Sequence, residues 1–267
     1  MAIIALQSAA SGLGALDTAM DVTANNLANV NTPGYKASRA NFQDLLYIEK
    51  EQPGTKNANG DQRPTGLYVG LGVKVSGTQL DFRQGPPQMT SRQLDLNIQG
   101  DGFFHVKVDD SLGSDAYTRA GNFTLNSDGE LVLASDQGRR LEPPIIIDPD
   151  VTSVSISADG MVRVMKPGNL QLQDVGRLQI ASFVNPTGLK QIGENLFVPS
   201  DASGPASEGN PGEERRGKIA QGQLEASNVD PTTELIDLIK TQRAYEMNSQ
   251  SIRAADESLR TIAQLRR

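Results

Sequence analysis

A helical repeat opens the chain, in the stretch Leu6-Gln7-Ser8-Ala9-Ala10-Ser11-Gly12-Leu13-Gly14-Ala15-Leu16-Asp17-Thr18-Ala19-Met20. Mostly apolar residues recur along it at alternating spacings of three and four, and the pattern continues to residue 30. Such spacing places one narrow apolar seam along a helix, as in a coiled coil. The members of this N-terminal seam are Leu6, Ala9, Leu13, Leu16, Met20, Thr23, Leu27 and Val30.

The C-terminal end of the chain carries a second seam of the same kind, flanked by charged residues of both signs. At about 1.5 Å per residue, the seams predict helices of roughly 42 Å over residues 3–30 and roughly 50 Å over residues 231–264. Each predicted helix has one narrow apolar stripe, so we expect the two to pair and to pack further against helices of other subunits. The members of the C-terminal seam are Leu238, Thr241, Tyr245, Asn248, Ile252, Ala255, Leu259 and Ile262.

Composition argues against several classes of protein. The 267 residues contain only 4% aromatic and 37% hydrophobic residues, which is lean for the core of a large enzyme. The net charge of -7 and the absence of a Lys/Arg cluster exclude a typical nucleic-acid binder. The chain has no cysteine, so disulfides and thiol chemistry are excluded. No apolar run approaches the roughly 18 residues of a membrane span, and no basic region precedes the first apolar residues, so we expect no cleaved signal peptide.

The apolar pattern changes to strict alternation after Gly66, which is typical of half-buried strands. The alternating residues are Val73 and Val75, then Leu94, Leu96 and Ile98, then Phe104, Val106 and Val108. Asp128-Gly129 and Asp159-Gly160 each lie between such runs, and Asp-Gly favours tight hairpin turns. These patterns predict a small antiparallel sandwich or barrel from about residue 70 to 217.

The predicted fold class is therefore α+β: N- and C-terminal helices form a coiled coil, with a central antiparallel all-β domain inserted between them. The expected helical domain is residues 1–32 plus 231–267, the connecting segment is 33–70 plus 218–230, and the β-rich outer domain is 71–217. Within the connecting segment, residues 50–66 have the Pro, Gly and Asn content of a loop. Asp230 is predicted to cap the second helix, with Pro231 in its first turn.

A cluster of asparagines lies near the end of the first helix, before the helix breakers Pro33 and Gly34. Asparagine is a poor helix former, so the cluster has two interpretations. It is either an uncharged hydrogen-bonding face pressed against neighbouring subunits or a fraying helix end. Its members are Asn25, Asn26, Asn29 and Asn31.

The sequence offers little catalytic chemistry. His105 is the single histidine, which gives little support to a metal site or a histidine-based triad. Two carboxylate pairs, Asp109-Asp110 and Glu213-Glu214, lie in loop-like surroundings and are best interpreted as solvated charge. We therefore predict no catalytic residue, no cofactor and no metal.

One long block resembles a known family. The stretch Ala24-Asn25-Asn26-Leu27-Ala28-Asn29-Val30-Asn31-Thr32-Pro33-Gly34-Tyr35-Lys36 is similar to the N-terminal signature of the bacterial flagellar rod and hook family. Its continuation from Ser38 to Tyr47 is most similar to the distal rod branch. Further blocks resemble the family in the same order, at residues 100–104, 117–123, 183–186, 188–189 and 239–249.

The resemblance implies a structural subunit that self-assembles into a rigid helical tube and transmits torque from motor to hook. The terminal helices would form the inner coiled-coil layer and the β region would pack outside. Segment 50–66 would extend between subunits and keep the tube straight. The implied partners are further copies of the chain, the proximal rod and hook proteins at its ends, the surrounding ring proteins and the flagellar export apparatus. The implied location is the basal body, from the periplasm to the outer membrane, reached by export without signal cleavage.

The candidate site is a set of interface residues. The seams are carried by Leu6, Leu13, Leu16, Met20, Leu27, Leu238, Tyr245, Ile252 and Leu259, and lateral contacts by Asn25, Asn26, Asn29, Tyr35 and Lys36. Within the family the alternatives are a hook or a proximal rod subunit, which the block after Tyr35 and the segment 50–72 would distinguish. A rod-associated cell-wall enzyme is the alternative from another class, and a zymogram on peptidoglycan would reveal it.

Overall fold

The computed structural model describes residues 2–54, 62, 64–110, 113–168 and 171–265. The chain divides into two compact units. Unit 1 comprises residues 1–28, 38–80 and 230–267, and unit 2 comprises residues 29–37 and 81–229. No helix in the described part of the chain is long and apolar enough to cross a membrane.

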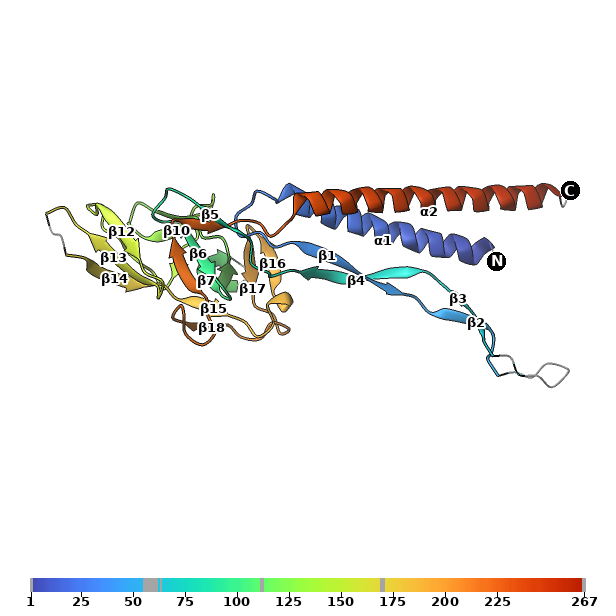
Figure 1. Cartoon of the computed structure of the whole chain (residues 1–267), viewed down its shortest axis with the longest axis horizontal. Helices are drawn as coiled ribbons and strands as arrows, with labels where there is room; N and C mark the ends of the chain where they lie inside the picture. The colour runs from blue at the N-terminus through green and yellow to red at the C-terminus, as the bar shows by residue number, and fades with distance from the viewer. Residues whose placement is uncertain (1, 55–61, 63, 111–112, 169–170, 266–267) are drawn as a thin grey trace. The chain divides into compact units, whose positions relative to one another are not determined.

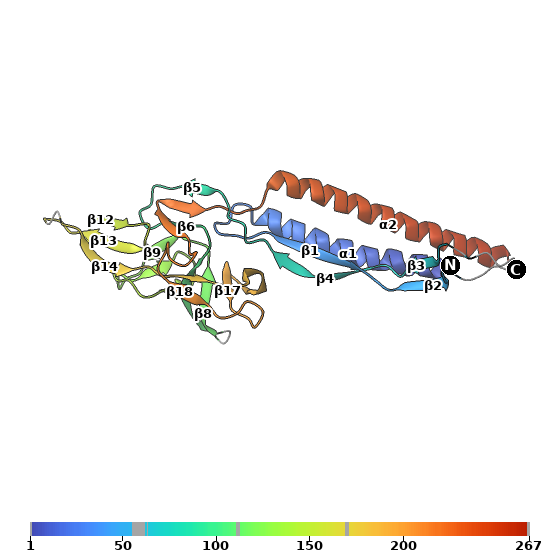
Figure 2. The same cartoon turned by 60° about the horizontal axis from the view of Figure 1, so that its bottom comes forward.

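Two long helices, α1 (Ala2–Ala28) and α2 (Pro231–Leu265), dominate unit 1. They lie side by side and run in opposite directions (Figures 1 and 2). Both predicted helices are thus confirmed, whereas the pairing as a coiled coil stays a prediction. Helix α1 ends at Ala28, slightly before the predicted end at residue 30, and a turn closed by the Thr32 amide on the Asn29 carbonyl (3.1 Å) follows it.

The predicted cap of α2 is present. The Thr232 amide donates to a carboxylate oxygen of Asp230 (3.0 Å), and the Thr233 hydroxyl donates to the other (2.8 Å). These hydrogen bonds, with the Thr233 hydroxyl contributing most, lower the pKa of Asp230. The capped helix begins at Pro231, where the missing amide proton costs nothing.

A long antiparallel ribbon completes unit 1 (Figure 1). In its first part Ser38 pairs with Leu80 and Asp44 with Val73, and in its second part Tyr47 pairs with Gly70 and Glu51 with Leu67. Most of this range falls in the connecting segment predicted above, and the division into three domains stays a prediction. Within segment 50–66, residues 55–61 and 63 lie outside the described ranges, and the contact between subunits that the resemblance implies for this segment stays a prediction. The strands of the ribbon are β1 (Ser38–Asp44), β2 (Tyr47–Glu51), β3 (Leu67–Gly70) and β4 (Val73–Leu80).

Unit 2 is built from antiparallel strand pairs. Its largest sheet has the order β16-β17-β8-β7-β15-β18, with β11 also paired to β7, and a second sheet has the order β12-β13-β14. Two-stranded ribbons pair β9 with β10, β6 with β19 and β5 with β20. The strands are β5 (Pro87–Met89), β6 (Leu96–Gln99), β7 (Phe103–Asp110), β8 (Gly113–Thr118), β9 (Phe123–Leu125), β10 (Leu131–Leu133), β11 (Leu141–Glu142), β12 (Ser153–Ile156), β13 (Met161–Met165), β14 (Gln173–Arg177), β15 (Ile180–Ser182), β16 (Lys190–Gly193), β17 (Leu196–Val198), β18 (Ser207–Gly209), β19 (Lys218–Gln221) and β20 (Gln223–Glu225), with a short 3-10 helix at Pro186–Gly188.

Both predicted Asp-Gly turns are confirmed. Gly129 connects β9 to β10 and Gly160 connects β12 to β13, and in each case the two strands pair antiparallel. Both glycines have positive φ, 77° and 84°, which favours glycine. Turn chemistry alone therefore located two hairpins of unit 2.

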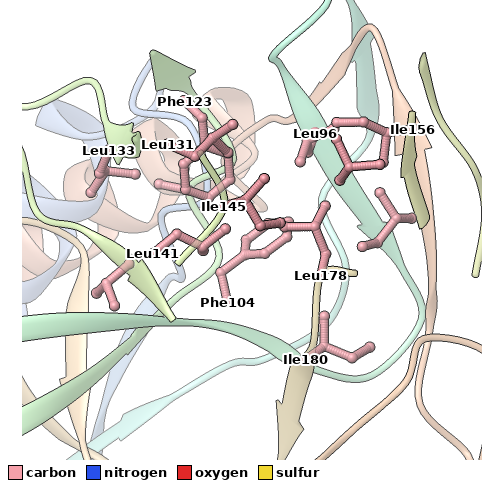
Figure 3. Close-up of a cluster of buried hydrophobic side chains, with 14 of the residues drawn as sticks. Leu96, Phe104, Phe123, Leu131, Leu133, Leu141, Ile145, Ile156, Leu178 and Ile180 are labelled. Carbon is pink, nitrogen blue, oxygen red and sulfur yellow. The ribbon is translucent and has the colours of Figure 1, made fainter. Parts of the chain in front are cut away.

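The core of unit 2 is a cluster of aliphatic residues around two perpendicular aromatic rings (Figure 3). The rings of Phe104 and Phe123 meet edge to face at 5.1 Å, and both side chains are completely buried. Leu96, Leu131 and Ile180 pack in the same cluster. Aromatic residues of two family-like blocks, Phe104 and Phe123, thus form the centre of this core.

Candidate assembly surfaces

Most of the described seam residues of α1 and α2 lie at half-buried positions. Asn248 of α2 approaches α1 closely, because a Cβ atom added to Gly12 would lie 2.6 Å from its Nδ2 atom. Ala15, one turn further along α1, is 4% exposed. The small residues of α1 therefore allow its backbone to approach α2 closely. The half-buried candidate residues are Leu6, Leu13, Leu16, Met20, Leu27, Leu238 and Ile252, while Tyr245 and Leu259 are each 36% exposed.

Helix α2 carries further apolar residues that the seam does not include. We call them the outer stripe: Leu235, Ile236, Ile239 and Met247, whose exposed fractions are 45, 48, 50 and 61%. Charged pairs such as Lys240 with Asp237 (3.0 Å) lie on the same helix. Four large apolar side chains on one arc of a solvated helix form a surface that favours a partner.

Asn26 is the buried member of the asparagine cluster. Its amide donates to the Ser38 carbonyl (2.7 Å) and to the Glu234 carboxylate (3.2 Å), and its oxygen accepts from the Ser38 amide (2.9 Å). Burial raises the pKa of Glu234, and the bond from Asn26 partly offsets this effect. Asn26 thus joins α1, β1 and α2 within unit 1. Asn25, by contrast, is exposed and Asn29 is half-buried, with its side-chain oxygen accepting from the Thr32 hydroxyl (3.2 Å).

The ribbon exposes a second apolar surface. Besides the contacts of Asn26 with Ser38, the ribbon bonds to α1 through the Val73 amide, which donates to the Ser11 hydroxyl (3.3 Å). Leu46, between β1 and β2, is 82% exposed. We call the exposed large residues of this region the ribbon patch: Phe42, Leu46, Tyr47, Ile48, Leu67 and Tyr68.

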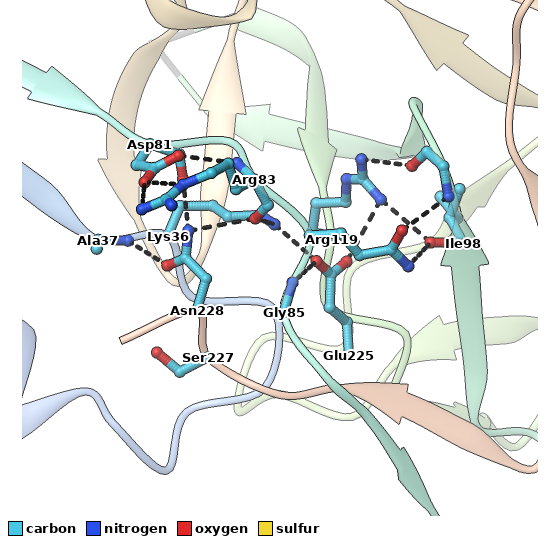
Figure 4. Close-up of polar contacts among 12 residues, drawn as sticks. Lys36, Ala37, Asp81, Arg83, Gly85, Ile98, Arg119, Glu225, Ser227 and Asn228 are labelled. Carbon is cyan, nitrogen blue, oxygen red and sulfur yellow. Dashed lines mark hydrogen bonds and ion pairs between the residues drawn. The ribbon is translucent and has the colours of Figure 1, made fainter. Parts of the chain in front are cut away.

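Lys36 lies in unit 2, where its side chain is completely buried. Its ammonium group donates to Glu225 Oε1 (2.6 Å) and to the Arg83 carbonyl (2.8 Å), as Figure 4 shows. Burial lowers the pKa of Lys36 despite the attraction of Glu225. The preceding Tyr35 is half-buried, and its carbonyl accepts from the Asn228 amide (3.4 Å).

The described side chains that were considered for catalysis contact other side chains of unit 2. The two ring nitrogens of His105 lie 3.1 Å from Asp115 and 2.9 Å from Glu208, and its ring stacks on Tyr117 at 5.0 Å. Glu214 pairs with Arg216 at 3.0 Å, while the side chains of Asp109-Asp110 lie outside the described part. Among the described residues, no group of three His, Asp or Glu side chains is arranged to hold a metal ion.

Sequence reasoning missed the outer stripe and the ribbon patch. The signal for the stripe was present, because Leu235, Ile236 and Ile239 fall outside the three-four spacing of the seam. The ribbon patch gave a weaker signal. Leu45-Leu46-Tyr47-Ile48 is an apolar run without the alternation that marks one buried face.

Comparisons with known proteins agree along the whole chain. Residues 6–36 match a family model described as flagella basal body rod protein, residues 97–164 match the flagellar hook protein FlgE/F/G D1 domain, and residues 220–265 match the flagellar basal body rod FlgEFG protein C-terminal region. The chain is 44% identical to the flagellar basal-body rod protein FlgG of Caulobacter vibrioides, over 98% of this chain and 99% of that protein.

Two further relatives with the same name are similar to this chain. The Agrobacterium fabrum protein is 42% identical to this chain, over 95% of both proteins. The Borreliella burgdorferi protein is 41% identical to it, over 98% of both proteins. Identity at this level over nearly the full length of each protein, together with the matching terminal and central segments, shows that the chain belongs to the flagellar basal-body rod protein family.

Proposed function

We propose that this chain is a structural subunit of the distal rod, in which many copies assemble into a rigid helical tube that transmits torque from motor to hook. The observation that carries the proposal is the outer stripe of α2. At about 100° per residue, the stripe and the seam are centred roughly 180° apart around the helix. A helix with apolar residues on two opposite faces is suited to two partners, one on each face.

The first partner is α1 of the same chain, paired along the seam as a coiled coil. The second is a helix of a neighbouring copy, which would cover the outer stripe. Such a contact joins two different surfaces and does not close on itself, so it builds a filament. Fully burying one Leu or Ile contributes about 1.5–3 kcal/mol, so the half-exposed residues of the stripe contribute less each and stability comes from repetition along the tube.

The ribbon patch supplies a separate contact in this proposal. An exposed row of aromatic and aliphatic side chains, continuous with segment 50–66, would extend to a neighbouring subunit and oppose bending. Tyr47 and Tyr68, which are 58 and 50% exposed, can bury their rings while their hydroxyls stay in water. Rigidity would then result from two contacts at different distances from the tube axis.

In this proposal, the buried candidate interface residues have a different role from those that are exposed or half-buried. Asn25, Asn29 and Tyr35 would make lateral contacts between subunits. Asn26 and Lys36 would act from inside the subunit, by holding the chain in position. The chain would work without enzymatic activity, between the proximal rod and hook proteins, inside the ring proteins, and after export without signal cleavage.

The test is Ile239→Asp, expressed in a strain that lacks the native gene. The charge lies on the outer stripe and leaves the core of each unit intact, so the purified chain should keep its circular dichroism spectrum while the cells lose rods and motility. Val184→Asp is the matched control, because Val184 is 93% exposed on unit 2. Normal motility with Ile239→Asp would refute a subunit contact through the stripe.

A further inference from the structure

Three charged side chains are buried together in unit 2. The carboxylate of Glu225 is 1% exposed and lies between the side chains of Lys36 (0%) and Arg119 (4%). Lys36 contacts Oε1 at 2.6 Å and Arg119 contacts Oε2 at 3.3 Å, so the two cations approach different oxygens (Figure 4). We call this group the Glu225 cluster. Two buried positive charges therefore depend on one buried negative charge.

The cluster lies where the chain enters and leaves unit 2. The chain passes from one unit to the other after residues 28, 37, 80 and 229. Lys36, Arg83, Glu225 and Asn228 all lie within five residues of one of these passages. Residues 29–37, 81–85 and 225–229, which continue covalently into unit 1, thus meet around one carboxylate.

Hydrogen bonds join the three segments to one another. Asn228 donates to the Asp81 carbonyl (2.7 Å) and accepts from the Ala37 amide (2.7 Å), so its side chain touches both other segments. The Asp81 amide donates to the Ala37 carbonyl (2.8 Å). Glu225 accepts from the Gly85 amide through Oε1 (2.9 Å).

Arg119 connects this group to the body of unit 2. Its guanidinium donates to the carbonyls of Gly100 (2.8 Å) and Ile98 (3.3 Å) and lies over the ring of Phe103 at 5.3 Å. The backbone of Glu225 is part of β20, and its carbonyl accepts from the Gly34 amide (2.8 Å). Glu225 therefore contacts both the passage segments and the arginine held by the sheets.

We propose that Glu225 is a positioning residue that clamps all four chain passages to the core of unit 2. Force carried along the chain between the two units then enters unit 2 at one cross-linked point instead of peeling single strands from it. The proposal goes beyond assembly, because it concerns the isolated subunit. It holds or fails independently of the contacts between subunits.

The charges make a specific test possible. Glu225→Gln removes the buried counter-charge of two buried cations, whereas Lys36→Met leaves the balanced pair of Glu225 and Arg119. Removing one partner of a buried ion pair is strongly destabilising, because the other charge stays uncompensated. Adding Lys36→Met to Glu225→Gln should therefore partly restore the clamp. If Glu225 and Lys36 only filled space, the double variant should instead be less stable than either single variant.

Hydrogen exchange of the full chain measures the clamp directly. In Glu225→Gln, exchange should accelerate at least about tenfold at the amides of Gly34, Asp81 and Gly85, and less in Lys36→Met. The double variant should exchange more slowly than Glu225→Gln. Arg163→Ala, which breaks the exposed pair of Arg163 and Asp174 (2.9 Å), should leave these amides unchanged.

Two results would overturn the proposal. One is a Glu225→Gln chain whose exchange at these three amides matches the wild type. The other is a double variant that exchanges faster than Glu225→Gln. If Glu225→Gln does not fold at all, the double variant must recover a soluble folded chain, and its failure to do so would contradict the charge argument. Loss of rods in the Ile239→Asp strain concerns the other proposal and leaves this one untouched.

Discussion

Gly34 lies in the family-like block at a position where both conformation and space favour glycine. Its φ of 71° is in the left-handed region, and an added Cβ would lie 2.6 Å from the Ala120 nitrogen and 2.7 Å from the Arg119 carbonyl carbon. These neighbours are backbone atoms and cannot rotate away. Its own amide donates to the Glu225 carbonyl at 2.8 Å, which holds the turn in place.

The substitution Gly34→Ala should destabilise unit 2 by about 2–5 kcal/mol. The left-handed conformation costs an L-residue about 1–2 kcal/mol. Forcing an extra atom into a packed site adds about 1–3 kcal/mol. Gly204→Ala separates the two costs, because Gly204 has a similar φ of 77° with no atom within 4 Å of an added Cβ. This control should lose only the conformational part, about 1–2 kcal/mol.

Urea unfolding of the full chain is the assay, with near-ultraviolet circular dichroism of tyrosine as the signal. The chain has no tryptophan, and Tyr117, which is 4% exposed, reports on unit 2. The difference in the free energy of unfolding between Gly34→Ala and Gly204→Ala isolates the cost of the overlap between the added Cβ and the backbone of residues 119 and 120. A Gly34→Ala chain no less stable than Gly204→Ala would refute the close approach of these two segments.

Three further substitutions test the core, the ionisation of a buried phenol and the seam. Phe104→Ala should cost about 3–5 kcal/mol in the free energy of urea unfolding, whereas Val184→Ala on the surface should change it by less than about 0.5 kcal/mol; equal effects would contradict the core. Burial, and then the charge of Glu208, raise the pKa of Tyr117, so its stabilising contribution is complete below the unfolded pKa of about 10 and is lost as the pH rises above it. Tyr117→Phe should therefore lose less stability than the wild type between about pH 9 and about pH 11, and equal losses would contradict the burial of this phenol. Tyr245→Asp should abolish rod assembly and keep the β strands folded, and normal motility in that strain would exclude the proposed seam.

Sequence patterns predicted the features that depend on local chemistry. The cap at Asp230 and the turns at Gly129 and Gly160 were predictable, because each rests on the preference of a few adjacent residues. The two terminal helices were predictable because their seams extend over many turns. The family-like blocks then gave the order of the parts, which periodicity could not provide.

The missed features depend on contacts between distant residues. Strands β1 and β2 bury neither face well, so no alternation marks them in the sequence. Lys36 looks like an ordinary surface lysine, because its partner Glu225 lies 189 positions away. Asn26 and Asn25 are adjacent and chemically identical, and only the positions of Ser38 and Glu234 make one of them buried. The sequence therefore indicated the candidate interface region but not which of its side chains are buried inside the subunit.

Electron microscopy of basal bodies isolated from cells that lack this gene tests the central claim most directly. If the chain builds the distal rod, the basal bodies should end in a rod stub that stops before the outer rings. A complete rod without a hook would assign the chain to the hook instead. Intact flagella would contradict a structural role in the rod.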